Sequence, residues 1–500
     1  MICSSQRLEE SNIEQINLAV EAAHSAFPSY RKLLGAERSA FLEKIALEIE
    51  NLGDDLLRIC SGETALPIAR LAAEGRRTIN QIRMFAELVK NGAWRDARID
   101  RAINDRKPLP RPDLRRILVP IGPCGVWAAS NFPLAFSVAG GDSISALAAG
   151  NPIVVKAHPA HPVTSDMVAR AIIRAIRACR LSDGVFSMIQ GRTPKTSLAL
   201  VQHALLRAAA FTGSFKAGRA LYNAATERET PIPLFAEMGS VNPVFVLPEA
   251  LEQRSEAIAQ GLTNSVNMDV GQFCTSPGLI VGLESKSLDR FSDQMRTCFA
   301  QVPPGRMLYS GIRASFEVAV ERLRRIPEMQ TTSGVPAPPD GCEATPALFE
   351  STAEVALARD ELFDEVFGPS SILIRCRSTV EMENIARRVQ GSLTATLHGT
   401  TEDFKAHRNL VFILETRVGR MILNGYPTGV EVCASMQHGG PYPATTDSRF
   451  TSVGTAAIQR FARPLCYQDF PQDMLPAELL DENPLRILRT VDGVFSREAL

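Results

Sequence analysis

Short apolar runs alternate with amphipathic segments between residues 116 and 235, and this alternation most restricts the folds open to the chain. Strands that alternate with helices form right-handed β-α-β units around a parallel sheet. Such a sheet offers a ligand crevice at the carboxyl ends of its strands, so a nucleotide-binding domain is the first expectation. The predicted strands are 117–120, 153–155, 186–189 and 208–211, and the predicted helices are 136–149, 163–179 and 194–204.

The flanking segments have different patterns. Residues 11–95 are predicted to be helical, because apolar residues recur there at three- and four-residue spacing among charges. The proline-dense stretch 106–113 fits neither regular element and predicts an extended connector. A second α/β segment is predicted from 238 to 440, with strands at 244–247, 279–281 and 372–374, and the tail after 445 is rich in proline.

Composition excludes several classes of protein. The 500 residues carry 54 basic and 55 acidic side chains, a formal net charge of −1, which does not suit a nucleic-acid or membrane-surface binder. Neither a signal peptide nor a membrane-spanning run is predicted, so a cytoplasmic location is expected. The ten cysteines have no paired spacing and suggest reduced thiols. The seven histidines form no metal-binding motif with them, so no metal site is expected.

Three polar residues stand in settings that suit chemistry. Cys274 lies in a loop of small residues before an apolar strand, and a thiolate is the nucleophile that needs least activation at neutral pH. Glu237 has apolar neighbours and a glycine nearby, where burial would raise its pKa toward that of a general base. The Asn131 amide follows a predicted strand and can donate to an oxyanion. Taken singly, they could equally be a buried structural cysteine, a surface glutamate and a turn asparagine.

Seven short motifs occur in order along nearly the whole chain, and together they resemble the aldehyde dehydrogenase superfamily. The resemblance implies an α/β, aldehyde dehydrogenase-like fold with a Rossmann-type cofactor domain, an α/β catalytic domain and a small oligomerisation element. The motifs are PIGPCGV (120–126), SNFPL (130–134), VVK (154–156), FTGS (211–214), EMGSVNP (237–243), GQFCTSPG (271–278) and EVFGP (365–369).

The resemblance also implies a division of the chain. Residues 1–102 and 119–236 would form the cofactor-binding domain, and 237–444 the catalytic domain. Residues 103–118 and 445–500 would form the oligomerisation element and tail. Relatives are dimers or tetramers, so a homodimer or homotetramer is expected.

The implied chemistry converts an aldehyde to a carboxylic acid. On the resemblance, Cys274 is the nucleophile, Glu237 the general base and Asn131 the oxyanion donor. The thiol adds to the carbonyl carbon, and the Asn131 amide and the Cys274 backbone N–H hold the oxyanion. Hydride transfer to NAD(P)+ leaves a thioester, which water activated by Glu237 hydrolyses.

Five further residues resemble the family's cofactor contacts. Glu365 and Phe367 would hold the nicotinamide ribose and ring, and Lys156 the adenosine ribose. The chain has no GxGxxG motif, but Gly213 and Ser214 resemble the looser glycine turn that lies near the cofactor phosphates at a helix start.

The choice between NAD and NADP depends on the residues after Lys156. In relatives that prefer NAD, a glutamate often stands three residues beyond that lysine. Here Pro159 takes that position and His158 precedes it, so NADP+ should be tolerated and even preferred. A solvated loop histidine is an equally good interpretation of His158.

A narrower resemblance concerns the substrate. Four segments are similar to the subgroup that oxidises 2-oxoglutarate semialdehyde (2,5-dioxopentanoate) to 2-oxoglutarate, and also to some NADP-dependent long-chain aldehyde dehydrogenases. The segments are 105–115, 130–142, 156–162 and 424–454.

A substrate carboxylate calls for an arginine near the pocket mouth. Arg70 and Arg77 lie on one face of a predicted helix. Arg77 is the predicted substrate contact, whereas surface salt bridging is the preferred interpretation of Arg70. Phe132 and His438 are further candidates for the pocket lining, by their position in the motifs.

Three alternatives remain open from the sequence. The substrate could be an aliphatic or aromatic aldehyde. The chain could be a catalytically retired scaffold, although all three catalytic residues are present. A thiol hydrolase is disfavoured because no histidine stands near a nucleophile motif.

Overall fold

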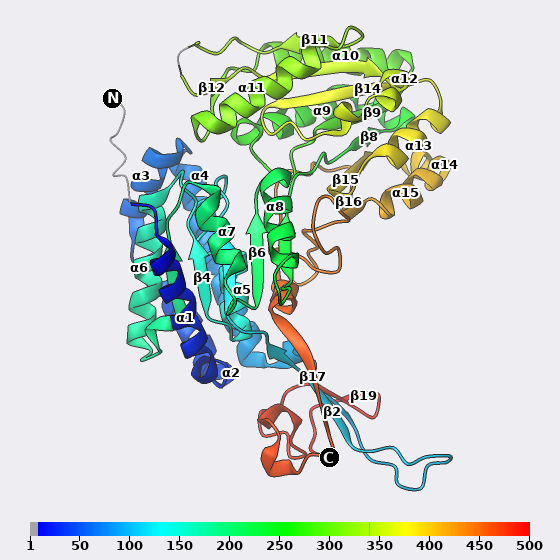
Figure 1. Ribbon diagram of the computed structural model, residues 1–500. Coiled ribbons are helices and arrows are strands. Elements are labelled where there is room, and N and C mark those ends of the chain that lie inside the picture. Colours follow the sequence, from blue (N-terminus) through cyan, green and yellow to red (C-terminus); the bar gives the residue numbers. More distant parts are fainter. Residues whose placement is uncertain (1–8, 340) are drawn as a thin grey trace.

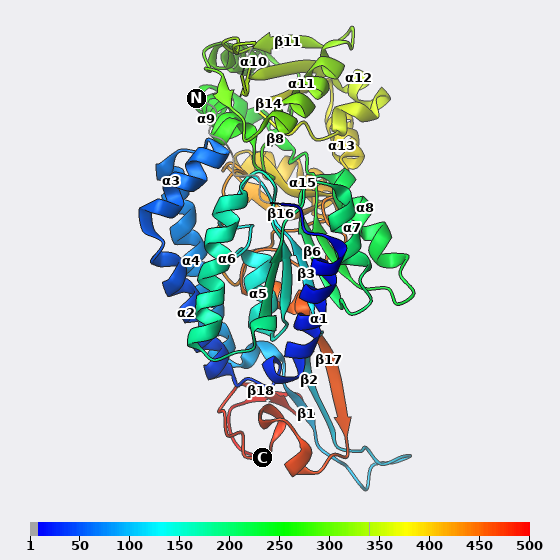
Figure 2. The same ribbon diagram turned by 60° about the vertical axis from the view of Figure 1, so that its left-hand side comes forward.

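The protein is built around three sheets, which Figures 1 and 2 show one below the other. The structure is a computed structural model that describes residues 9–339 and 341–500. The start of the predicted cofactor-binding part, with Cys3, lies outside the described residues. Within the described part, no helix is long and apolar enough to cross a membrane, and all nine described cysteines are free.

The first sheet is fully parallel and has the strand order β5-β4-β3-β6-β7. Strands β3 and β4 are buried along their whole length, as expected for a parallel sheet with helices on both faces. The predicted alternation of strands and helices is therefore confirmed here. The strands are β3 (Cys124–Trp127), β4 (Ile153–Lys156), β5 (Phe186–Ile189), β6 (Ala208–Thr212) and β7 (Leu234–Glu237).

Helices pack on this sheet (Figure 2). The predicted helical stretch 11–95 is confirmed as four helices, and Asn12 begins the first with a capping box. The predicted helix 136–149 is shorter, because residues 133–140 form turns. The helices are α1 (Ile13–Tyr30), α2 (Gly35–Glu50), α3 (Gly53–Thr64), α4 (Ile68–Asn91), α5 (Gly141–Ala149), α6 (Pro162–Ala178), α7 (Pro194–Gln202) and α8 (Phe215–Thr226).

The second sheet has seven strands, in the order β11-β13-β14-β9-β8-β15-β16, and only β11 is antiparallel to its neighbour. Its strands are β8 (Val244–Val246), β9 (Leu279–Leu283), β11 (Gln330–Ser333), β13 (Ala347–Thr352), β14 (Ser370–Cys376), β15 (Ser392–His398) and β16 (Val418–Leu423). The helices of this part of the chain are α9 (Pro248–Asn267), α10 (Lys286–Ala300), α11 (Ser310–Arg324), α12 (Ala353–Ala358), α13 (Thr379–Arg388), α14 (Thr401–Ala406) and α15 (Arg408–Glu415). A separate two-stranded sheet pairs β10 (Gly305–Arg306) with β12 (Glu343–Ala344).

The third sheet joins two strands from residues 98–120 to three strands near the end of the chain, at the bottom of Figure 1. Its order is β17-β2-β1-β18-β19. The predicted strand 117–120 lies here as part of β2 rather than in the first sheet, because seven residues of β17 pair with it antiparallel. The strands are β1 (Arg98–Asp100), β2 (Leu114–Pro120), β17 (Ala462–Gln468), β18 (Arg489–Val491) and β19 (Val494–Ser496).

Two segments depart from the predicted division. Strand β1, counted with the cofactor-binding part, pairs in the third sheet. Residues 455–461, counted with the tail, form the short helix η5, whose Ala457, Ile458 and Phe461 are buried in the core under the first sheet. The domain limits themselves stay a prediction.

Gly271 allows two loops beside the candidate site to pack closely against each other. Gly271 has φ +66°, and a Cβ there would lie 2.2 Å from the Gly368 carbonyl oxygen and 2.6 Å from the Pro369 nitrogen. Only glycine allows this close approach of two backbones.

Gly271→Ala is therefore expected to destabilise the fold by about 2–4 kcal/mol, through left-handed strain and overpacking. Differential scanning calorimetry would show a lower thermal midpoint. The control is Gly62→Ala in α3, where an added Cβ meets nothing within 4 Å. Equal midpoints for the two variants would contradict the expectation.

Candidate active site

Four predicted site residues lie at the same edge of the first sheet. Lys156 ends β4, Glu237 ends β7, Gly213 follows β6 directly, and Asn131 lies in the turn after β3. In a parallel sheet the carboxyl ends of neighbouring strands meet at one edge, where the order of strands leaves a crevice. The first sheet thus gathers residues that are far apart in the sequence.

The cysteine comes from the second sheet, in a loop between η3 (Met268–Gly271) and β9. The Asn242 side chain fixes this loop by donating to the carbonyls of Cys274 at 2.8 Å and Ser276 at 2.9 Å. Asn242 itself has φ +52°, a conformation that asparagine tolerates better than most residues. Asn242 lies in the EMGSVNP motif, but no function was predicted for it.

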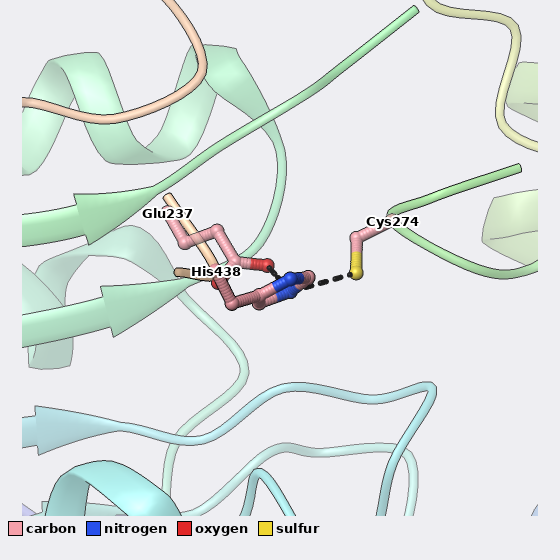
Figure 3. A group of neighbouring side chains, drawn as sticks. All are labelled: Glu237, Cys274 and His438. Carbon is pink, nitrogen blue, oxygen red and sulfur yellow. Dashed lines mark hydrogen bonds and ion pairs between the residues drawn. The ribbon is translucent and has the colours of Figure 1, made fainter. Parts of the chain in front are cut away.

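Cys274, His438 and Glu237 form one cluster, and Figure 3 shows the imidazole between the thiol and the carboxylate. His438 Nε2 lies 3.4 Å from Cys274 Sγ and 3.1 Å from Glu237 Oε1. Ser452 Oγ donates to the other carboxylate oxygen of Glu237 and lies 3.1 Å from the His438 carbonyl oxygen. The thiol is half-buried, whereas Glu237 and His438 are buried.

The expectation that no histidine stands near the nucleophile is wrong, because His438 contacts Cys274. His438 was predicted only as a pocket-lining residue, and Ser452 was not predicted. The sequence separation of 164 residues between the thiol and the imidazole hides the contact from any local motif.

The predicted direction of the Glu237 pKa is wrong. Burial alone would raise it, but the nearby His438 and the hydrogen bonds from His438 and Ser452 hold the pKa below its usual value. The pKa of Cys274 moves the other way, well above its usual value, because the thiol is desolvated and the Glu237 and Glu365 carboxylates repel a thiolate. At neutral pH the resting cysteine is therefore a thiol beside an ionised carboxylate.

Asn131 lies against the cysteine loop. Its Nδ2 donates to the Gln272 carbonyl at 3.0 Å, which uses one of the two amide hydrogens, and its own carbonyl accepts from Arg70 at 2.9 Å. The contact fixes the amide near the loop that carries Cys274. Its role as oxyanion donor stays a prediction.

Glu365 and Phe367 line a pocket with Gly271, Phe273 and Ser240. The Ser240 N–H donates to Glu365 Oε1 at 3.2 Å, and burial raises the pKa of Glu365 to about 7. The other oxygen, Oε2, would lie 2.6 Å from a Cβ placed on residue 239, so the glycine there lets the carboxylate fit.

The opposite end of the crevice suits phosphate and ribose groups. Gly213 and Ser214 precede α8, whose first turn offers backbone N–H groups and the positive end of a helix dipole. The Lys156 side chain is buried nearby at the end of β4, and burial lowers its pKa to about 8. Together with Glu365, these residues offer the charged and hydrogen-bonding groups that suit a nicotinamide dinucleotide.

His158 is not a solvated loop histidine, and its contact with the cofactor stays a prediction. Its ring stacks on His161 at 5.6 Å and lies 5.9 Å from the Tyr309 ring, so it is not a solvated loop histidine. Burial, His161 and Lys156 hold its pKa well below the usual value, so at neutral pH it carries no charge for a 2′-phosphate.

The predicted pocket residues lie side by side. Phe132 contacts Phe273 at 5.2 Å between ring centroids, and the Arg77 guanidinium lies over Phe136 at 5.3 Å. Arg77 Nη1 is buried without a hydrogen-bond partner among the described residues, and the charge of a Cys274 thiolate acts on this guanidinium. An unpartnered buried donor of this kind is unusual and points to a missing acceptor.

Arg70 is correctly predicted to form salt bridges, but the bridges are not on the surface. Its half-buried guanidinium pairs with Glu74 and with Asp269, the latter at 2.8 Å. Because Asp269 belongs to η3, this network ties α4 to the cysteine loop.

Arg420 on β16 was not predicted. Its Nη1 and Nη2 donate to the Gly429 and Pro427 carbonyls, but its Nε is buried without a partner in the described part of the chain. The charge of a Cys274 thiolate acts on Arg420 as it does on Arg77. A charged residue inside an otherwise apolar strand was the only local sign of it.

Comparison with known proteins agrees with this geometry. Residues 4–442 match the model of the aldehyde dehydrogenase family. The chain belongs to that family. This aldehyde dehydrogenase is therefore an oxidoreductase that uses NAD or NADP, and the predicted fold class is confirmed.

Its relatives cover nearly the whole chain. It is 47% identical to "Alpha-ketoglutaric semialdehyde dehydrogenase 2" of Azospirillum brasilense, over 96% of this chain and 91% of the relative. It is 44% identical to the "Alpha-ketoglutaric semialdehyde dehydrogenase" of Acinetobacter baylyi, over 98% and 93%. A solved gamma-glutamyl-gamma-aminobutyraldehyde dehydrogenase from Burkholderia cenocepacia superposes with a TM-score of 0.78 at 21% identity, over 91% of this chain and 88% of that one.

The raised pKa of Cys274 predicts how the free dehydrogenase reacts with iodoacetamide. Because the thiolate fraction grows as pH rises toward the pKa, the alkylation rate of Cys274 should increase about tenfold per pH unit from pH 7 to 9. Mass spectrometry of the tryptic peptide would follow the rate at this residue.

His438→Gln should react more slowly than wild type at every pH, because the thiolate loses its imidazole partner. Exposed Cys466 in the same samples is the internal control. A wild-type rate that is already constant by pH 7 would contradict the raised pKa.

Proposed function

We propose that this enzyme oxidises 2-oxoglutarate semialdehyde to 2-oxoglutarate with NAD(P)+. The observation that carries the proposal is the cluster of Cys274, His438 and Glu237, together with two incompletely paired arginines on which the charge of a Cys274 thiolate acts. The names of the two relatives that are 44% and 47% identical support the substrate.

The first step is formation of the nucleophile. Cys274 is a thiol at rest, and the ionised Glu237 carboxylate beside it is the base, while His438 Nε2–H donates to that carboxylate at 3.1 Å. The proton moves from the sulfur to a Glu237 carboxylate oxygen, and His438 Nε2–H, 3.4 Å from the sulfur, is placed to donate to the thiolate that forms. The sulfur then bonds to the aldehyde carbon, and the carbonyl π electrons become the lone pair of an oxyanion.

Asn131 and the backbone N–H of Cys274 hold this oxyanion, and one amide hydrogen of Asn131 is not used by Gln272. Bound NAD(P)+ supplies the hydride acceptor. The cysteine is left as a thioester. Glu237 releases the thiol's proton to bulk water, and then takes a proton from the water that attacks the thioester, which it returns to the Cys274 thiolate when the tetrahedral adduct collapses. The acid leaves and the thiol is restored.

The distal end of the substrate is a 2-oxo carboxylate, and two arginines suit it. Arg77 has a free buried Nη1 and Arg420 a free buried Nε in the described structure. A carboxylate accepts such donors with charge-assisted hydrogen bonds. The aromatic rings of Phe132, Phe136 and Phe273 enclose the space beside Arg77.

Cofactor preference and assembly follow as finer parts of the proposal. NADP+ tolerance rests on Lys156 and on the missing glutamate, since the neutral His158 adds no charge. A homodimer or homotetramer is supported by the third sheet, whose edge strand β19 exposes 67% of Val494 and 74% of Phe495. A cytoplasmic location belongs to the proposal as well.

Substrate choice is tested by NADH and NADPH formation with 2-oxoglutarate semialdehyde, hexanal and benzaldehyde. The semialdehyde should give the highest kcat/KM, and Cys274→Ala should abolish turnover with all three. Highest turnover on hexanal or benzaldehyde would refute the substrate and keep the chemistry. No turnover on any aldehyde would favour a scaffold.

The arginines are tested by Arg77→Met and Arg420→Met. Loss of one charge-assisted hydrogen bond, at about 1.5–3 kcal/mol, should raise KM for the semialdehyde at least about tenfold. KM for hexanal, which has no carboxylate, should change little. Arg76→Met is the matched control, because Arg76 is the exposed neighbour on the same helix. An equal rise of KM for both aldehydes would show a merely structural role.

A further inference from the structure

The catalytic cluster has a second chemical property that the oxidation does not require. Cys274, His438 and Glu237 offer a sulfur, an imidazole nitrogen and a carboxylate oxygen, all within 4.8 Å of one another. These are the three donor types that zinc takes in proteins. The sequence predicted no metal site, because the donors are separated by 164 and 201 residues and match no spacing motif.

The distances between the donors suit one small ion. Zn–S bonds of about 2.3 Å and Zn–N or Zn–O bonds of about 2.0 Å at tetrahedral angles place S and N about 3.5 Å apart and N and O about 3.3 Å apart. In the structure the corresponding distances are 3.4 Å and 3.1 Å. The third edge, from sulfur to carboxylate oxygen, is at most 4.8 Å, against about 3.5 Å for tetrahedral bonds to one zinc ion.

Charge and access also favour a dication. A thiolate and the Glu237 carboxylate together carry two negative charges within 4.8 Å of each other, and their repulsion is relieved by a doubly positive ion. The thiol is half-buried rather than enclosed, so an ion can reach it from the substrate side. An oxygen or substrate-side water can fill the fourth position, as in open zinc sites.

The outer contacts indicate an exchangeable ion rather than a resident one. When His438 Nε2 binds metal, the proton moves to Nδ1, and Nδ1 has no hydrogen-bond partner among the described residues. Permanent zinc sites nearly always fix this second nitrogen with an acceptor. The expected affinity is therefore below that of a structural zinc site.

We propose that Cys274 Sγ, His438 Nε2 and the Glu237 carboxylate bind one Zn2+ ion, which reversibly blocks the enzyme by occupying its nucleophile. The Cys274 thiol loses its proton to the buffer as the sulfur–zinc bond forms, and no oxidation occurs. Chelation of the ion restores the thiol.

Binding is tested without substrate or cofactor, so that the result does not depend on the proposed function. Co2+ is the spectroscopic probe, since a cysteine thiolate gives a charge-transfer band when it binds cobalt, and Zn2+ should displace it in a titration. Wild type should bind one Co2+ per chain. Cys274→Ser should abolish the band, and His438→Gln and Glu237→Gln should each weaken binding by more than about 100-fold.

The control variant is Cys466→Ser, which removes an exposed thiol away from the cluster and should keep both the band and the activity. In assays, Zn2+ should inhibit, EDTA should reverse the inhibition, and Mg2+ should have no effect, because it prefers oxygen ligands. A band that survives Cys274→Ser, or is lost in Cys466→Ser, would overturn the proposal. So would Zn2+ affinity unchanged in His438→Gln.

Discussion

The contact of one imidazole nitrogen with both a thiol and a carboxylate is the interaction on which the site depends. Glu237 comes from the end of a strand in the first sheet, Cys274 from a loop before the second, and His438 from the segment that returns to the first sheet. Each side chain needs the others, since a buried carboxylate without partners would take up a proton. With His438 and Ser452 in place it stays ionised.

Backbone constraints hold the three parts at the required distance. Gly271 brings the cysteine loop against Gly368, beside the loop that carries Glu365, and Asn242 fixes the cysteine carbonyl. The Arg70 network ties the same loop to α4. These residues touch no reacting atom, yet a shift of the loop by an ångström would separate the thiol from its base.

Neighbouring groups of this site have pKa values that are shifted in opposite directions. It raises the pKa of Cys274 and Glu365, which lack strong cationic partners, while Glu237 keeps a low pKa beside His438. The resting enzyme therefore stores a protonated nucleophile beside an ionised carboxylate. The same arrangement underlies the proposed proton transfer from Cys274 to Glu237 and the proposed affinity for a zinc ion.

Much of the fold could be predicted from local patterns, because hydrophobic period is a property of neighbouring residues. Helices fill most of the stretch 11–95 as expected, and β4 and β6 lie where apolar runs occur. Ordered motifs gave Cys274, Glu237 and the family. Strand 117–120 was assigned to the wrong sheet because its partner β17 lies more than 300 residues later. The roles of His438 and Ser452 had no local sign, the only local sign of Arg420 was a charge in an apolar strand, and the pKa of Glu237 was predicted in the wrong direction. The sequence by itself determined the elements, the nucleophile and the chemistry of the family; only the tertiary structure decided which groups meet, because pKa, proton transfer and metal affinity depend on distances between residues far apart in the chain.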